Sequence, residues 1–143
     1  MSCGSSNKDQ TFSKPEIVGE VELMLHNYFQ DIAEEGLLAE FKFLDDSDEF
    51  FWVPPGYTSA ISYDSVRIIL ESRAAGYEYI KFDWESLKIN PLNTSYAAYT
   101  GVVRGMMKDT AGVEADVALI ETGVVIKRDA GWKLLCGQSR ALE

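Results

Sequence analysis

The sequence predicts an α+β domain. Apolar residues recur at helical spacing between Ile17 and Ile32, and again in residues 62–76. From Tyr77 onward the spacing changes to alternation, which is typical of strands, and it continues to the C-terminus. Because the helices come first and the strands then follow one another, we expect helices packed against an antiparallel sheet.

The bulk composition sets limits on size and partners. The chain has 143 residues, of which 46% are hydrophobic, as expected for one globular domain with a substantial core. Its formal net charge of -10 argues against nucleic acid or an anionic membrane surface as a partner, because both need a cationic face. No apolar run reaches the roughly 18–20 residues that a membrane span requires.

Residues 1–13 are rich in Ser, Asn and Lys and are expected to form a flexible tail before a domain of residues 14–143. The segment around Cys3 resembles the start of a mature bacterial lipoprotein, whose acylated cysteine is followed by a small polar tether. An ordinary tail is the alternative. The location is therefore left open between the cytoplasm and the bacterial envelope, where a lipid anchor at Cys3 would place the protein.

Capping residues mark the expected helices. Ser13 can cap the first helix, which Gly36 ends. The apolar segment Leu37–Leu44 is interpreted as a second helix. Ser62 can cap a third helix that stops at Gly76.

A short strand and four consecutive longer ones are expected. Pro54-Pro55-Gly56 ends the short strand. The apolar set changes parity after Trp84, which predicts a β-bulge near Glu85-Ser86. A tight turn at residues 129–131 joins the last two strands. The expected strands span residues 50–53, 77–90, 96–107, 113–128 and 132 onward.

The expected turns give an approximate register for the last three strands. Pairing about Thr110 sets Tyr99 opposite Glu121, and the last turn sets Glu121 near Arg140. Tyr99, Glu121 and Gln138 then share one face of the sheet. The opposite face is apolar as well, so both faces need a cover. The helices can cover one face, and we expect a second copy of the chain to cover the other in a homodimer.

This order of elements resembles the nuclear transport factor 2-like superfamily, and within it the SnoaL-like branch. The matching motifs are Tyr28-Phe29-Gln30-Asp31, Val53-Pro54-Pro55-Gly56 and above all the segment 124–135, which reads VVIKRDAGWKLL. The resemblance covers about Lys14 to Glu143. It implies a cone-shaped curved antiparallel sheet wrapped around three N-terminal helices, with a cavity between them.

The resemblance also bears on activity. The superfamily includes isomerases, dehydratases, cyclases, epoxide hydrolases and pure binding or oligomerisation domains. Many relatives carry His after the Trp-Lys motif, whereas this chain has Cys136, Gly137 and Gln138. A mechanism that depends on His at the end of the last strand is therefore not indicated.

Aromatic side chains with polar tips around one carboxylate would suit a pocket for a small, mostly apolar molecule. In an enzyme Glu121 would be the general base, with Tyr99 or Tyr28 donating a hydrogen bond to a developing oxyanion. Alternatively Glu121 pairs with Arg140 or faces water, and the domain is a protein-binding or oligomerisation scaffold. No motif for a metal or cofactor was found. The expected lining consists of Tyr28, Trp52, Tyr57, Trp84, Tyr99, Glu121 and Gln138.

Overall fold

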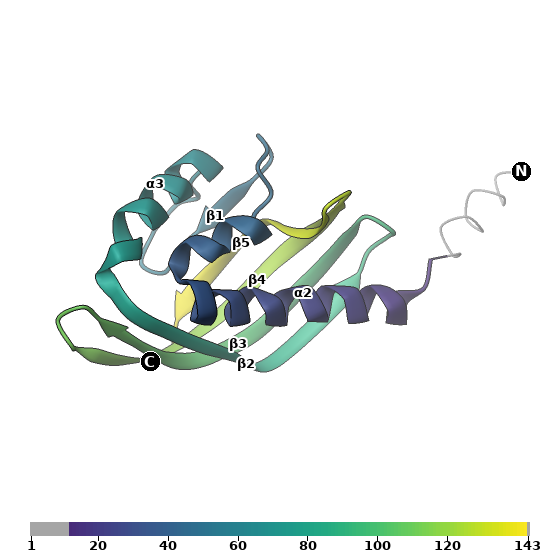
Figure 1. Ribbon diagram of the computed structural model, residues 1–143. Helices are drawn as coiled ribbons and strands as arrows, with labels where there is room; N and C mark the ends of the chain where they lie inside the picture. The colour runs from purple at the N-terminus through teal and green to yellow at the C-terminus, as the bar shows by residue number, and fades with distance from the viewer. Residues whose placement is uncertain (1–11, 143) are drawn as a thin grey trace, which may run out of the picture.

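The computed structural model describes residues 12–142, in which three helical segments precede a run of four strands (Figure 1). A short additional strand lies between the second and third helical segments. The elements are α2 (Lys14–Glu35), the 3₁₀ helix η1 (Leu37–Phe43), β1 (Phe51–Val53), α3 (Tyr63–Arg73) extended by η2 (Ala74–Gly76), β2 (Tyr77–Pro91), β3 (Tyr96–Asp109), β4 (Glu114–Arg128) and β5 (Gly131–Ala141).

The expected helix starts are confirmed. The Ser13 hydroxyl accepts a hydrogen bond from the backbone N–H of Glu16 at 3.3 Å. The Ser62 hydroxyl accepts one from Ser65 at 3.2 Å. Gly36 ends α2 with φ of 97°, a left-handed conformation that glycine adopts without a steric cost.

The sheet has five strands in the order β1-β5-β4-β3-β2 and is open. The four long strands pair antiparallel, as expected, whereas β1 runs parallel to β5. The sheet is therefore mixed. The early strand is separated from β5 by most of the chain, so no hairpin turn fixes its direction.

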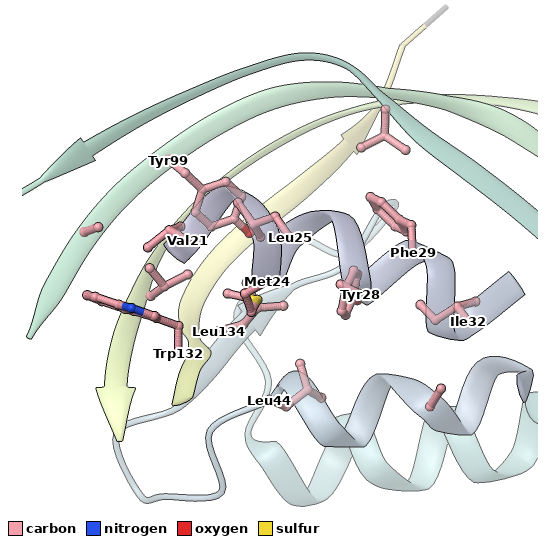
Figure 2. Close-up of a cluster of buried hydrophobic side chains, with 14 of the residues drawn as sticks. Val21, Met24, Leu25, Tyr28, Phe29, Ile32, Leu44, Tyr99, Trp132 and Leu134 are labelled. Atoms are coloured by element: carbon pink, nitrogen blue, oxygen red, sulfur yellow. The ribbon is translucent and has the colours of Figure 1, made fainter. Parts of the chain in front are cut away.

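The long strands curve around α2, which lies along the concave face, while α3 stands at one end of the sheet (Figure 1). In Figure 2, Tyr99 and Leu134 point from the sheet toward the helix residues Val21 and Leu25. Val21 and Leu25 have no solvent-accessible surface. Burial of a leucine of this kind stabilises the fold by about 1.5–3 kcal/mol, so the α2–sheet contact is a major part of the core.

The β-bulge predicted near Glu85-Ser86 is confirmed. Trp84 pairs with Val103 and Ser86 pairs with Val102, which leaves Glu85 as the extra residue. The bulge keeps the apolar residues on both of its sides directed at the core.

The register expected between β3 and β4 is wrong by two residues, since Tyr99 pairs with Gly123 and not with Glu121. The turn is centred on Ala111, one residue later than expected, and the Asp109 carboxylate accepts hydrogen bonds there from the N–H groups of Ala111 and Val113, both at 2.9 Å. A shift of two residues preserves the alternation of faces. Tyr99 and Glu121 therefore still lie on the same face.

The register expected between β4 and β5 is wrong by one residue at Glu121. Glu121 pairs with Ser139, whereas Ile120 pairs with Arg140. Arg128 pairs with Gly131, so the turn lies one position earlier than expected and shifts the register by two residues. A bulge between Val124 and Val125, which the sequence analysis did not predict, reduces this error to one residue. A slip of one residue exchanges the faces of a strand, so Ser139 takes the place expected for Arg140 and Gln138 moves to the outer face.

Within residues 12–142, no helix is long and apolar enough to cross a membrane. Cys3, the predicted site of a lipid anchor, lies outside the described residues.

Candidate functional site

A cavity of about 380 Å³ lies between the concave face of the sheet and the helices α2, η1 and α3. Its wall is mainly aliphatic and aromatic, with a few polar side chains. The polar or partly polar members of the lining are Tyr28, Glu40, Trp52, Arg73, Tyr77, Glu121 and Ser139.

Glu121 lies in the middle of β4 and points toward the cavity with 6% of its surface exposed. Tyr99 donates a hydrogen bond to its Oε2 at 2.6 Å, and Ser139 donates one to its Oε1 at 3.0 Å. Trp52 donates from Nε1 to the Ser139 hydroxyl at 3.1 Å. The hydroxyl of Ser139 therefore uses its only proton on Glu121, and both carboxyl oxygens act as acceptors.

Two glycines make room for the Trp52 side chain. A Cβ atom on Gly137 would lie 2.8 Å from Cη2 of Trp52, and one on Gly123 would lie 3.3 Å from the same atom. These two glycines pair with each other across β4 and β5. The bare backbone therefore lets the indole lie close to the sheet, where its N–H reaches Ser139.

A second carboxyl faces the cavity from η1. Tyr28 donates a hydrogen bond to Oε1 of Glu40 at 2.5 Å. Loss of solvation raises the pKa of Glu40 from its usual value of 4.5 to about 7, against the opposing effect of the Tyr28 hydrogen bond. The negative charge of Glu121 contributes to the same rise, so the two carboxyls interact electrostatically.

Burial also raises the pKa of Glu121, although hydrogen bonds from Tyr99 and Ser139 favour its ionised form. Burial together with the neighbouring carboxyl raises the pKa of Tyr99 well above its usual range, and Tyr28 behaves in the same way. Both phenols therefore remain protonated donors at neutral pH. The site combines two hydroxyl donors with two carboxyls of raised pKa, of which Glu40 can exchange protons near pH 7.

Three of the residues expected in the pocket line the cavity, namely Tyr28, Trp52 and Glu121. Tyr99 stands behind Glu121, with 2% of its surface exposed, and acts through its hydrogen bond. The structure therefore brings four of the expected residues into one connected region. The alternative in which Glu121 pairs with Arg140 is wrong, because Glu121 bonds to Tyr99 and Ser139.

The other three expected residues lie elsewhere. Trp84 packs in the core beside Tyr99 and donates from Nε1 to the backbone oxygen of Leu25 at 3.0 Å. Tyr57 is 41% exposed and is not part of the cavity wall. Gln138 is exposed on the outer face, where it pairs with Thr122.

Sequence reasoning missed Glu40 and Ser139. Glu40 stands within the apolar segment Leu37–Phe43, and a lone acid in such a segment is a signal that could have singled it out. Ser139 carried no comparable signal, because its position beside Glu121 depends on the bulge in the last hairpin. Among residues 12–142, no group of three or more potential metal-ligating side chains comes together.

Comparison with solved structures identifies the fold. The sequence matches no protein-family model and no curated protein. Among solved structures, a proposed scytalone dehydratase from Novosphingobium aromaticivorans superposes with a TM-score of 0.76 at 14% identity, covering 88% of this chain and 84% of that one. A proposed dehydratase of the NTF2-like family from Streptomyces avermitilis gives 0.72 at 18% identity, covering 91% and 99%.

A third similar structure is a proposed calcium/calmodulin-dependent protein kinase II association domain from Xanthomonas campestris. Its TM-score is 0.71 at 18% identity, with 86% of each chain covered. The three structures share the curved sheet and helices with this chain over most of their lengths. The protein therefore has the fold of the nuclear transport factor 2-like (NTF2-like) superfamily.

Proposed function

We propose that this protein binds a small, mostly apolar molecule in the cavity, with a polar group of the ligand directed at Glu121 and Glu40. The observation that carries the proposal is an apolar cavity of about 380 Å³ whose few polar groups include both carboxyls. Ligand sites in proteins typically have volumes of about 300–1,000 Å³ and the same contrast between apolar walls and few polar groups.

Two adjacent isoleucines in α3 provide a matched test. Ile69 lines the cavity, whereas Ile68 is 60% exposed on the same helix. We expect the neutral dye N-phenyl-1-naphthylamine to bind the wild-type protein with enhanced fluorescence. Ile69→Trp should fill the cavity and reduce dye affinity about tenfold or more, whereas Ile68→Trp should leave it unchanged. Equal binding by both variants would place the dye outside the cavity and contradict the proposal.

A second candidate is an isomerase, dehydratase or cyclase. The observation that favours it is a buried carboxyl, Glu121, with a raised pKa and a phenol donor, Tyr99, at 2.6 Å. Glu121 would act as general base, while Tyr99 keeps its carboxyl oriented. The test is deuterium exchange, followed by NMR, at the carbon next to the carbonyl of small cyclic ketones. Glu121→Gln should abolish enzyme-dependent exchange and retain folding, and exchange at the wild-type rate would remove this candidate.

A scaffold without a ligand is the third possibility, and one similar structure is described as an association domain. A scaffold would be favoured by an interior filled with side chains. The cavity volume therefore supports ligand binding ahead of it.

We further propose that two copies associate through the outer face of the sheet. Ile120 and Val124 retain accessible surface on that face, where apolar groups gain from being covered. Light scattering at micromolar concentration tests this association. The wild type should be a dimer and Ile120→Glu a monomer, and a wild-type monomer would contradict the proposal.

A further inference from the structure

Two acids face the cavity, and among residues 12–142 no cationic side chain forms an ion pair with them. Glu40 and Glu121 come from η1 and β4 and face the same space. In the described part of the chain, no Lys or Arg forms an ion pair with either carboxyl. Among the described residues that line the cavity, Arg73 is the one cationic side chain, and it is exposed at the end of α3.

The hydrogen bonds around Glu121 suit the ionised form. Tyr99 and Ser139 each donate to a different oxygen, and Ser139 is committed as a donor because Trp52 donates to it. Such an arrangement orients a carboxylate but supplies no counter-charge. Taking a carboxylate out of water without a paired cation is costly, and this cost raises the pKa of Glu121.

Glu40 also lacks a paired cation among the described residues. Tyr28 is its hydrogen-bond donor among the described residues, and that donor is neutral. The negative charge of Glu121 also raises the pKa of Glu40, so ionising both acids without a neighbouring cation is unfavourable. A positive group between them would relieve both costs at once.

We propose that the ligand of this cavity is an organic amine, bound as its ammonium ion by Glu40 and Glu121, with its apolar body against the aliphatic and aromatic wall. This inference rests on the proposed ligand-binding function and names the class of molecule. An ammonium group has three donors and can reach more than one carboxylate. A carboxylate ligand would meet two like charges, and a neutral alcohol would leave the buried charges without compensation.

Three probes with one ring and one spacer test the charge preference. They are 2-phenylethylamine, which is cationic, 2-phenylethanol, which is neutral, and 3-phenylpropanoate, which is anionic. Binding can be measured by displacement of N-phenyl-1-naphthylamine at about pH 8, which is above the pKa of about 7 of Glu40. We expect the amine to bind about tenfold or more tighter than the alcohol, and the anion to bind most weakly.

The affinity for the amine should decrease as the pH falls. As the pH falls through about 7, Glu40 takes up a proton and its attraction for the ammonium ion disappears. The amine should therefore lose about tenfold in affinity between about pH 8 and about pH 5.5, whereas the alcohol should change little. An amine affinity that is constant over this range would overturn the inference.

Substitutions test whether Glu40 and Glu121 cause the preference for the amine over the alcohol. Glu40→Gln and Glu121→Gln should each weaken the amine about tenfold and leave the alcohol unchanged. Glu34→Gln is the control, because Glu34 is exposed on α2 and the same net charge is removed away from the cavity. Thermal unfolding of each variant checks that it folds. A preference that survives in both cavity variants would overturn the proposal.

The results with the dye and the three probes distinguish a wrong charge preference from a cavity that binds no ligand. If the alcohol displaces the dye as well as the amine does, the cavity binds ligands but the charge preference is wrong. If the dye and all three probes fail to bind, both proposals fail.

Discussion

Replacing Glu40 by Gln should make the protein more stable at neutral and alkaline pH. The folded state holds the Glu40 proton more tightly than the unfolded chain does, because burial raises its pKa from 4.5 to about 7. Between these values the folded state binds more protons than the unfolded state, so the free energy of unfolding decreases as the pH rises. The cost is absent below the unfolded pKa and complete above the folded one.

The size of the effect follows from the same two values. One pKa unit corresponds to about 1.4 kcal/mol, which gives an upper limit of about 3 kcal/mol for Glu40. Glu40 retains some solvent-accessible surface, and the screening that this allows reduces the expected cost to about 1–2 kcal/mol. The amide of Gln resembles the protonated acid and can still accept the hydrogen bond from Tyr28.

The assay is urea unfolding, followed by tryptophan fluorescence, of the wild type and the variant at about pH 5 and about pH 8. The free energy of unfolding of Glu40→Gln relative to wild type should increase by about 1–2 kcal/mol between the two pH values. Glu34→Gln, on the exposed face of α2, should show no such change. A stability difference between Glu40→Gln and wild type that does not vary with pH would refute the assignment of a raised pKa to Glu40.

Three further substitutions test the packing. Gly137→Ala should destabilise the protein by about 1–3 kcal/mol in urea unfolding, because its new Cβ would lie 2.4 Å from the backbone oxygen of Thr122 and 2.8 Å from the Trp52 ring. Gly19→Ala should instead stabilise by about 0.5–1 kcal/mol, since Gly19 is inside α2 with nothing within 4 Å of the added carbon; a loss of stability would contradict this. Arg128→Ala should destabilise the protein at neutral pH, because two hydrogen bonds to the buried Asp45, at 2.8 and 2.9 Å, are lost. Arg128 holds the pKa of Asp45 below its usual value, so this cost should disappear as the pH falls through that low pKa, and a cost that persists in acid would disprove the pairing.

Much of the fold could be predicted because its signals are local. Ser13 and Ser62 begin their helices, and Gly36 ends one, through contacts with residues a few positions away in the sequence. The alternation of apolar residues marked the four long strands, and the change of parity after Trp84 marked the bulge. The direction of β1 was not predictable in this way, since it depends on a strand that comes much later in the chain.

The candidate site was predicted in part. Tyr99 and Glu121 were expected on one face, and they lie there because an error of two residues leaves the alternation unchanged. Gln138 was expected beside them and lies on the outer face, because one extra residue in the last hairpin exchanges Gln138 for Ser139.

The sequence by itself determined the succession of helices and strands, the helix ends and the apolar set that forms the core. These properties depend on hydrogen bonds and periodicities within short segments. Only the tertiary structure decided that Glu40 and Glu121 face one cavity, that Ser139 completes the hydrogen bonds of Glu121, and that the pKa of both acids is raised. Loss of solvation and the interaction between two charges arise when distant segments pack together, and no local pattern records them.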